Sequence, residues 1–310
     1  MHSPRLAAIS PILVGPTAVG KTDVMHCLAN KTRRAIISAD AMMVYRGMNI
    51  GTAKPTAMEL ERYSYHGIDL ADPDQYFSVH DYLRMLDEAV SHDTSGPGWM
   101  ICGGTGLYIR ALLVGLDSSS GADSELRKEG EAILSARGFD QLKEWCEEKR
   151  PGIASWLPRG DMENPRRWIR AVERGQLNHE QEIHAPVGVS ARIVGLRRTR
   201  ENLEARIAKR VEQMYIGGLL DEVKSLRDHY RDLSPTAEKA IGYHEAFAVL
   251  DGAMSVAEAR ERTVIRTRQY AKRQMTWFRH QLPTQWIDVG ENDAVEVIAE
   301  KVCSLWNIHE

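Results

Sequence analysis

Residues 15–22, which read GPTAVGKT, have the types and spacing needed to bind a phosphate group. In the pattern G-x-x-x-x-G-K-[ST], two glycines let the backbone curl so that several N–H groups point at one anion, and the helix that follows adds its positive end. Lys21 would bring a positive charge to the terminal phosphate, and the hydroxyl of Thr22 would be a ligand for Mg²⁺. An apolar run at 12–14 and helix-like residues after Thr22 give the expected strand and helix context. We therefore predict a P-loop, with phosphate contacts from Gly15, Thr17, Ala18, Val19, Gly20, Lys21 and Thr22.

Asp40 and Thr105 each follow an apolar run that is typical of a strand in a parallel sheet. Asp40 comes shortly after the run 35–37, and Thr105 lies in the turn GGTG that follows the run 99–102. Ligands of such folds bind at the carboxyl ends of the strands. Asp40 could act as a general base or a Mg²⁺ ligand, or could only cap a helix. Thr105 would offer a hydroxyl and an N–H to the same anion or to its acceptor, unless the glycines form only a turn.

Two segments, 164–170 and 272–279, interleave arginines with aromatic residues. Such a surface pairs with phosphates and stacks on unpaired bases, so we predict that both segments contact RNA. The alternative is that Trp168, Trp277 and Phe278 are core residues and only the arginines face outward.

Positive charge is concentrated in two windows, 192–210 and 258–279, which each hold seven Lys or Arg against two Glu. The formal net charge of the whole chain is only −3, so these are local basic surfaces or, alternatively, solvated helix faces. Arg206 and Arg210 are four residues apart and share a helical face, and either could bind a pyrophosphate.

The order of apolar segments predicts a parallel α/β sheet with a helical insertion. Runs at 12–14, 35–37, 67–70 and 99–102 are separated by room for helices or long loops, as in βαβ units. A helix is expected after Ser78. From 124 to about 182 the pattern is helical only, strand character returns at 191–196, and long helices are expected over 200–229 and 255–281. We predict a core domain of residues 1–119 and 189–310 and a helical insertion domain of residues 120–188.

Composition indicates an ordinary globular protein without metal-binding or disulfide patterns. The 310 residues are 43% hydrophobic and 27% charged, and the four cysteines are far apart with no C-x-x-C. No window approaches the roughly 20 apolar residues of a membrane span. We therefore expect a cytoplasmic protein with no membrane association.

Six ordered blocks, which extend over nearly the whole chain, resemble one family, the tRNA dimethylallyltransferases or tRNA isopentenyltransferases. The blocks are GPTAVGKT at 15–22, SADAMMVYRGMNIGTAKP at 38–55, GGTGLY at 103–108, NPRRWIRAVE at 164–173, AIGYHE at 240–245 and TRQYAKRQMTWFR at 267–279. The resemblance implies a P-loop NTPase-like α/β core and transfer of the dimethylallyl group from dimethylallyl pyrophosphate to N6 of adenosine 37 in tRNA, with release of pyrophosphate. It also implies Mg²⁺ as cofactor, the anticodon stem-loop of tRNA as partner, and a monomer.

The resemblance assigns roles to individual residues. Asp40 would take or orient the proton of the adenine amine, Thr105 would lie between leaving group and base, and Arg210 would meet the growing charge of the pyrophosphate together with the P-loop. The residues that would contact tRNA are Asp40, Ala41, Met42, Met43, Thr105, Arg127, Arg166, Arg167, Trp168, Ile169, Arg170, Lys239, Ala240, Ile241, Gly242, Tyr243, His244, Lys272, Arg273, Gln274, Met275, Thr276, Trp277, Phe278 and Arg279.

The sequence departs from the family pattern at Ala41 and Met43, where serine and glutamine are frequent, and at His244, where Lys or Arg is usual. Two other functions remain open from the residues alone. A small-molecule kinase would place ATP in the P-loop, but it does not explain the two Arg-aromatic segments. A nucleotide-switched RNA-binding module would need a guanine signature, and Asn30-Lys31 is followed by Thr32-Arg33 instead.

Overall fold

A computed structural model describes residues 11–92, 98–115, 124–157, 161–174 and 192–308. The chain divides into two compact units, one formed by Met1–Gly115 and Ala185–Glu310 and the other by Leu116–His184. The domain boundaries expected at 119/120 and 188/189 lie outside the described residues. Each unit has its own hydrophobic core.

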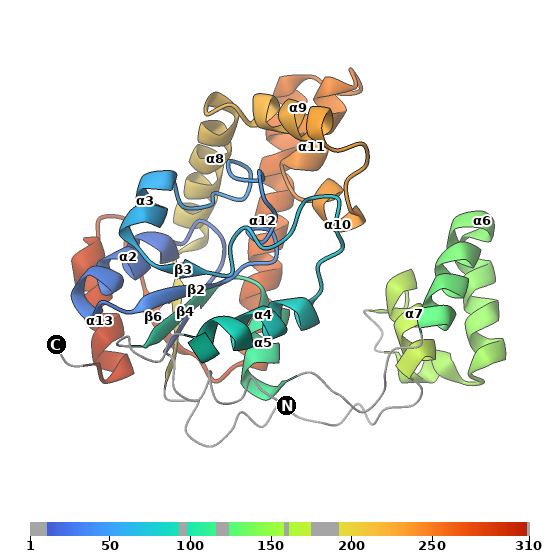
Figure 1. The fold of residues 1–310 in the computed structure, drawn as a ribbon, viewed down its shortest axis with the longest axis horizontal. Coiled ribbons are helices and arrows are strands. Elements are labelled where there is room, and N and C mark those ends of the chain that lie inside the picture. Colours follow the sequence, from blue (N-terminus) through green and yellow to red (C-terminus); the bar gives the residue numbers. More distant parts are fainter. Residues whose placement is uncertain (1–10, 93–97, 116–123, 158–160, 175–191, 309–310) are drawn as a thin grey trace. The chain divides into compact units, whose positions relative to one another are not determined.

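The first unit is built on a parallel sheet, which confirms the predicted α/β class (Figure 1). Among the described residues the strand order is β3-β2-β4-β1-β5-β6. The strands are β1 (Ile12–Val14), β2 (Ala35–Ala39), β3 (Tyr65–His66), β4 (Trp99–Gly103), β5 (Ile193–Arg197) and β6 (Gln285–Asp288). Strands β1 and β2 are buried along their whole length, because helices cover both faces of the sheet.

The helices of this unit follow the strands in the order that βαβ connections require. They are α2 (Lys21–Thr32), α3 (Ala57–Arg62), α4 (Val79–His92), α5 (Gly106–Val114), α8 (Arg200–Ile216), α9 (Leu219–His229), α10 (Pro235–Glu238), α11 (Tyr243–Leu250), α12 (Val256–Gln281) and α13 (Val295–Trp306). Helices α2 and α13 pack on one face of the sheet in a core that includes Leu13, Ile36 and Met100. Helices α4 and α5 lie on the opposite face (Figure 1).

Helix α12 is long and carries Tyr270 and Gln274, which line the candidate active site. Ser255 caps it, since its hydroxyl accepts from the N–H of Glu258 while the Glu258 carboxylate accepts from the N–H of Ser255. The buried face of the helix includes Thr267, Ala271, Gln274 and Phe278, which are three or four residues apart, as one face of a helix requires.

The structure differs from the expectations drawn from the sequence in three places. Residues 67–70 are not a strand, because Asp69 has a positive φ of 54° and the N–H groups of Asp69 and Leu70 donate to Met43 and Val44 rather than to the sheet. The helix expected over 200–229 is divided into α8 and α9 at Gly218, whose φ is 97°. Strand β6 was not expected from the sequence.

The second unit is helical in its described part. It contains α6 (Ser124–Lys149), a 3₁₀ turn at Ile153–Trp156 and α7 (Pro165–Arg174). Helix α6 is kinked at Gly138, which has a φ of 84°. The core of this second unit is formed around Leu142, Trp145 and Trp168. Within the described ranges of the whole chain, no helix is long and apolar enough to cross a membrane.

Candidate active site

The P-loop lies at the carboxyl end of β1 and leads into α2. Gly15 has a φ of 151°, and a Cβ there would come within 2.7 Å of the Leu196 carbonyl oxygen, so only glycine fits. Gly20 has a φ of 104° and forms the N-cap of α2. The loop therefore aims the positive end of α2 at the space above the sheet, as an anion site requires.

Lys21 folds back over the loop. Its Nζ donates to the carbonyl oxygens of Gly15 at 2.9 Å and Pro16 at 2.8 Å. Burial lowers the pKa of Lys21 from its ordinary value, while nearby Cys102 and Asp40 act in the opposite direction. The ammonium group is thus held at the loop, where it could neutralise the charge of a bound phosphate.

Three arginines, one from the connection between β5 and α8 and two from α8, donate to residues of the P-loop. Arg210 donates from Nη1 to the Thr17 hydroxyl at 3.0 Å, Arg206 from Nε to the Ala18 carbonyl at 2.8 Å, and Arg198 from Nε to the Val19 carbonyl at 3.0 Å. The sequence left open whether Arg206 or Arg210 reaches the anion site. Both contact the loop and line the same cavity. Burial lowers the pKa of Arg210, and the charge of Asp40 raises it.

Asp40 and Thr105 lie side by side because β2 and β4 are neighbours, with Ala39 paired to Gly103. The Thr105 N–H donates to the Ala39 carbonyl at 3.1 Å, and the Thr105 hydroxyl accepts from the Ala41 N–H at 3.0 Å. Asp40 is held in place by the Met42 N–H, which donates to Oδ1 at 2.9 Å. The strand pairing is close, since a Cβ on Gly103 would come within 2.2 Å of the Ala39 oxygen. Two residues 65 positions apart in the sequence therefore share one edge of the sheet.

One cavity of about 420 Å³ joins the P-loop to this edge of the sheet. It holds cationic, acidic and apolar side chains together, which suits a ligand with a charged head and an apolar tail. The residues that line it are Thr17, Ala18, Gly20, Lys21, Thr22, Asp23, Ile36, Ser38, Asp40, Met43, Thr52, Ala53, Pro55, Tyr65, Cys102, Gly103, Gly104, Arg206, Lys209, Arg210, Gln213, Tyr270 and Gln274.

Tyr270 is a site residue that the motif analysis did not single out. It lines the cavity from α12, and its hydroxyl lies close enough to the side chains of Thr105 and Gln274 to interact with them. Burial, together with the charge of Asp40, raises the pKa of Tyr270 to about 12, so the hydroxyl keeps its proton at neutral pH. Its position four residues before Gln274, on one helical face, is the signal that could have identified it.

The residues expected to contact tRNA include exposed, half-buried and buried side chains. Lys239, His244, Lys272, Arg273, Thr276 and Arg279 are exposed on the first unit, and Arg166 and Arg167 on the second. Those with buried side chains are Trp168, Ile169, Ala240, Tyr243, Gln274 and Phe278. The sequence left open whether Trp168, Trp277 and Phe278 face outward or belong to the core. Trp168 and Phe278 are core residues.

Three more of the predicted residues have identified contacts. Trp277 is half-buried against Gly106, where a Cβ would come within 2.5 Å of its ring. In the second unit, Arg127 donates to the buried carboxylate of Glu173 at 2.5 Å, and Arg170 donates to the same group at 3.0 Å.

The residues at the P-loop fit a magnesium ion that is mostly coordinated by its ligand and by water. The Thr22 hydroxyl and the Asp40 carboxylate face the same cavity, and oxygen is the ligand that Mg²⁺ prefers. In the described part of the chain there is no group of three or more His, Cys, Asp or Glu that could hold a metal ion by itself. Mg²⁺ would therefore use few protein ligands here.

The fold and the site define an α/β protein of the P-loop class. It has a parallel sheet, a P-loop at the end of β1 and an acidic residue after β2. A family model, IPP transferase, matches residues 43–281. The chain belongs to this family, as the ordered sequence blocks predict.

Similar proteins support this assignment at high coverage. The tRNA dimethylallyltransferase of Bacillus licheniformis is 38% identical over 287 residues, and the match covers 90% of each chain. The enzyme of the same name from Bacillus subtilis is also 38% identical, again with 90% of each chain covered. A crystal structure of a tRNA isopentenylpyrophosphate transferase from Bacillus halodurans matches with a TM-score of 0.67 at 35% identity and covers 96% of each chain.

Proposed function

We propose that the protein transfers the dimethylallyl group from dimethylallyl pyrophosphate to N6 of adenosine 37 in the anticodon loop of tRNA. The observation that carries this proposal is the cavity lined by P-loop residues and by Asp40. Thr105 lies next to Asp40 at the same edge of the sheet, where its hydroxyl accepts from the Ala41 N–H. A pyrophosphate on the P-loop would direct its allylic carbon toward the sheet edge where Asp40 and Thr105 lie. The names of the similar proteins support the same reaction.

The reaction breaks the bond between C1 and the pyrophosphate oxygen and forms a bond between C1 and N6. The leaving pyrophosphate gains negative charge, which the P-loop amides, Lys21 and Arg210 are positioned to stabilise. Mg²⁺, when bound beside Thr22, neutralises part of this charge. N6 loses a proton, and Asp40 accepts or orients it. Thr105, whose hydroxyl accepts from the Ala41 N–H, would lie between the leaving group and the base.

The adenine must leave the base stack to enter the cavity, at a cost of roughly a few kcal/mol. Exposed cations around the cavity, such as Lys272 and Arg273 on α12, would attract the phosphates of the stem-loop. The helical unit, with Arg166 and Arg167 exposed, would supply further phosphate contacts. The enzyme would act in the cytoplasm, where its tRNA substrate is found.

The decisive experiment incubates unmodified anticodon stem-loop RNA with protein, Mg²⁺ and dimethylallyl pyrophosphate, with ATP in a parallel reaction, and analyses the RNA by mass spectrometry. We expect one dimethylallyl group on the adenine 3′ of the anticodon. Asp40→Asn and Thr105→Ala should fold and bind RNA but lose most turnover, whereas the exposed control Asp232→Asn should keep it. Unchanged RNA together with ATP consumption would instead favour a small-molecule kinase.

A further inference from the structure

The loop between Met48 and Lys54 is held on one side by a carboxylate from α9. Glu222 accepts from the backbone N–H of Asn49 at 3.0 Å and of Ile50 at 2.9 Å. The Gly51 N–H also points at this group, at 3.5 Å. Successive N–H groups that converge on one anion form a concave anion site, and here a protein carboxylate fills it.

Tyr243 completes this arrangement from α11. Its hydroxyl donates to Glu222 Oε1 at 2.6 Å and is itself contacted by the backbone N–H groups of Gly51 and Thr52. The fully buried Tyr243 ring lies so close to Gly51 that a Cβ there would come within 2.3 Å of it. Burial raises the pKa of Tyr243 well above its ordinary value, so the hydroxyl remains a donor.

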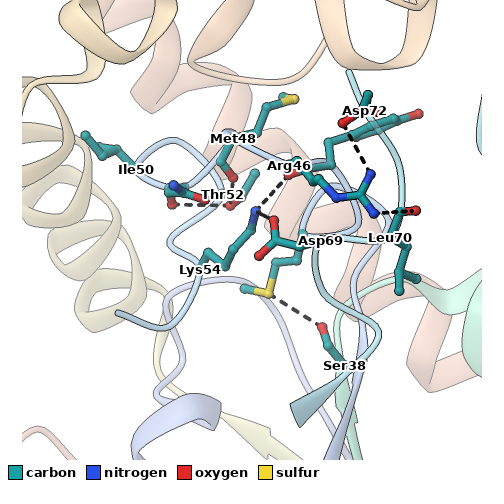
Figure 2. Close-up of polar contacts among 12 residues, drawn as sticks. Ser38, Arg46, Met48, Ile50, Thr52, Lys54, Asp69, Leu70 and Asp72 are labelled. Atoms are coloured by element: carbon teal, nitrogen blue, oxygen red, sulfur yellow. Dashed lines mark hydrogen bonds and ion pairs between the residues drawn. The ribbon is translucent and has the colours of Figure 1, made fainter. Parts of the chain in front are cut away.

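The opposite side of the same loop faces the cavity. The Thr52 carbonyl accepts from Arg210 Nη2 at 3.1 Å, while Arg210 Nη1 donates to the Thr17 hydroxyl of the P-loop at 3.0 Å. Internal bonds make the loop stiff, since the Thr52 hydroxyl donates to the Met48 carbonyl at 2.7 Å (Figure 2). The orientation of the Arg210 guanidinium therefore depends on the position of the Thr52 carbonyl.

We propose that Glu222, together with Tyr243, is a positioning residue for pyrophosphate binding: the pair fixes the loop so that the Thr52 carbonyl holds Arg210 against the P-loop. Glu222 does not touch the ligand and acts through Arg210. This inference rests on the proposed function for its link to prenyl transfer, but the binding of inorganic pyrophosphate tests it separately.

The test measures binding of inorganic pyrophosphate with Mg²⁺ by isothermal titration calorimetry, and KM and kcat with dimethylallyl pyrophosphate and stem-loop RNA. Glu222→Gln replaces an acceptor with an NH₂ group that faces backbone donors. We expect pyrophosphate affinity to fall roughly tenfold, and KM for dimethylallyl pyrophosphate to rise while KM for RNA changes little. Asp221→Asn, which removes the same charge from the adjacent exposed residue, is the control and should leave both values unchanged.

A double-mutant cycle separates positioning from general loss of structure. If Glu222 acts through Arg210, then Glu222→Gln should have little further effect in an Arg210→Gln background. An equal loss in both backgrounds, or unchanged pyrophosphate affinity, would overturn the proposal. If Glu222→Gln does not fold, Tyr243→Phe provides the same cycle, with an expected loss of roughly threefold. Failure of the wild-type protein to prenylate RNA, with the pyrophosphate effects intact, would reject the proposed function and leave the role of Glu222 standing.

Discussion

Gln274 accepts a hydrogen bond from the backbone N–H of Thr17 at 2.8 Å. The other end of the same carboxamide donates to the Gly104 carbonyl at 2.9 Å, so one buried side chain from α12 connects the P-loop to the glycine turn that carries Thr105. The contact is close, because a Cβ on Gly104 would come within 2.3 Å of Nε2. The spacing between the P-loop and the glycine turn therefore depends on Gln274.

Gln274→Glu should disrupt this connection, because it places a carboxylate oxygen against the Gly104 carbonyl. We expect the free energy of unfolding to fall by about 1–3 kcal/mol and turnover to fall at least roughly tenfold. Urea denaturation and the prenylation assay measure the two effects. Gln269→Glu, an exposed change on the same helix, is the matched control, and equal behaviour of the two variants would contradict the assigned role.

The contrast between Gln274 and the P-loop shows what the sequence could predict. The P-loop is a local pattern whose eight consecutive residues carry both the backbone shape and the chemistry, so its position and role follow from the sequence. Asp40 and Thr105 were predicted as site residues for a similar reason, since each lies just after a strand of the parallel sheet. Gln274 was expected at an RNA surface, but its side chain is buried and bonded to a residue 257 positions away.

The features that the sequence did not predict depend on such distant contacts. Residues 67–70 have strand-like composition, but their backbone donors pair with the loop after β2 instead of the sheet. Tyr270 and Glu222 belong to helices whose periodicity identifies them only as partly buried positions. Their functions arise from α9 and α12 packing against loops that lie far away in the sequence.

Tyr270→Phe removes only the hydroxyl that interacts with Thr105 and Gln274. Without this contact the Thr105 hydroxyl is less well fixed, so we expect kcat to fall roughly fivefold to tenfold with little change in RNA affinity. Steady-state kinetics with stem-loop RNA provide the measurement. The control is Tyr76→Phe, at an exposed tyrosine, which should behave as wild type. A kcat that stays at the wild-type value would show that the Tyr270 hydroxyl does not contribute to turnover.

Lys54 is a buried cation that connects the loop after β2 to the segment that follows β3. Its Nζ donates to the Tyr45 carbonyl at 2.7 Å and to the Asp69 carboxylate at 2.6 Å. Figure 2 shows Lys54 beside Asp69. Lys54→Met keeps most of the volume but leaves both acceptors unsatisfied, so we expect a loss of about 2–3 kcal/mol in the free energy of unfolding. Thermal and urea denaturation test this prediction. Lys31→Met, which breaks a more exposed pair with Glu300, should cost at most about 1 kcal/mol.

Arg273 is exposed on α12 beside Tyr270, with its guanidinium 5.9 Å from the centre of the ring. If it contacts an RNA phosphate, Arg273→Gln should weaken stem-loop binding and reduce the slope of log affinity against log salt by about 0.7–0.9. Binding titrations at several salt concentrations measure the slope. Arg231→Gln, at a residue whose side chain is 98% exposed, serves as the control. An unaltered slope for Arg273→Gln would show that this residue does not touch phosphate.

Cys102 places a thiol in the cavity wall near Lys21 and Asp40. Burial raises the pKa of Cys102 to about 11, with Lys21 acting in the opposite direction. Because the thiolate is the reactive form, only about one thiol in a thousand is reactive at about pH 8, three units below the pKa. Alkylation by iodoacetamide should therefore be slow at that pH and accelerate about tenfold for each unit up to about pH 10.

Two comparisons make the Cys102 prediction specific to the cavity. Pyrophosphate with Mg²⁺ should slow alkylation of Cys102 if the anion occupies the P-loop beside it. Cys146, which is buried in the helical unit and has its pKa raised by burial to about 12, should react more slowly and without protection by pyrophosphate. Peptide mass spectrometry after timed alkylation separates the two cysteines. Rapid alkylation of Cys102 at neutral pH, or equal protection of both cysteines, would be inconsistent with a neutral thiol in the wall of the anion site.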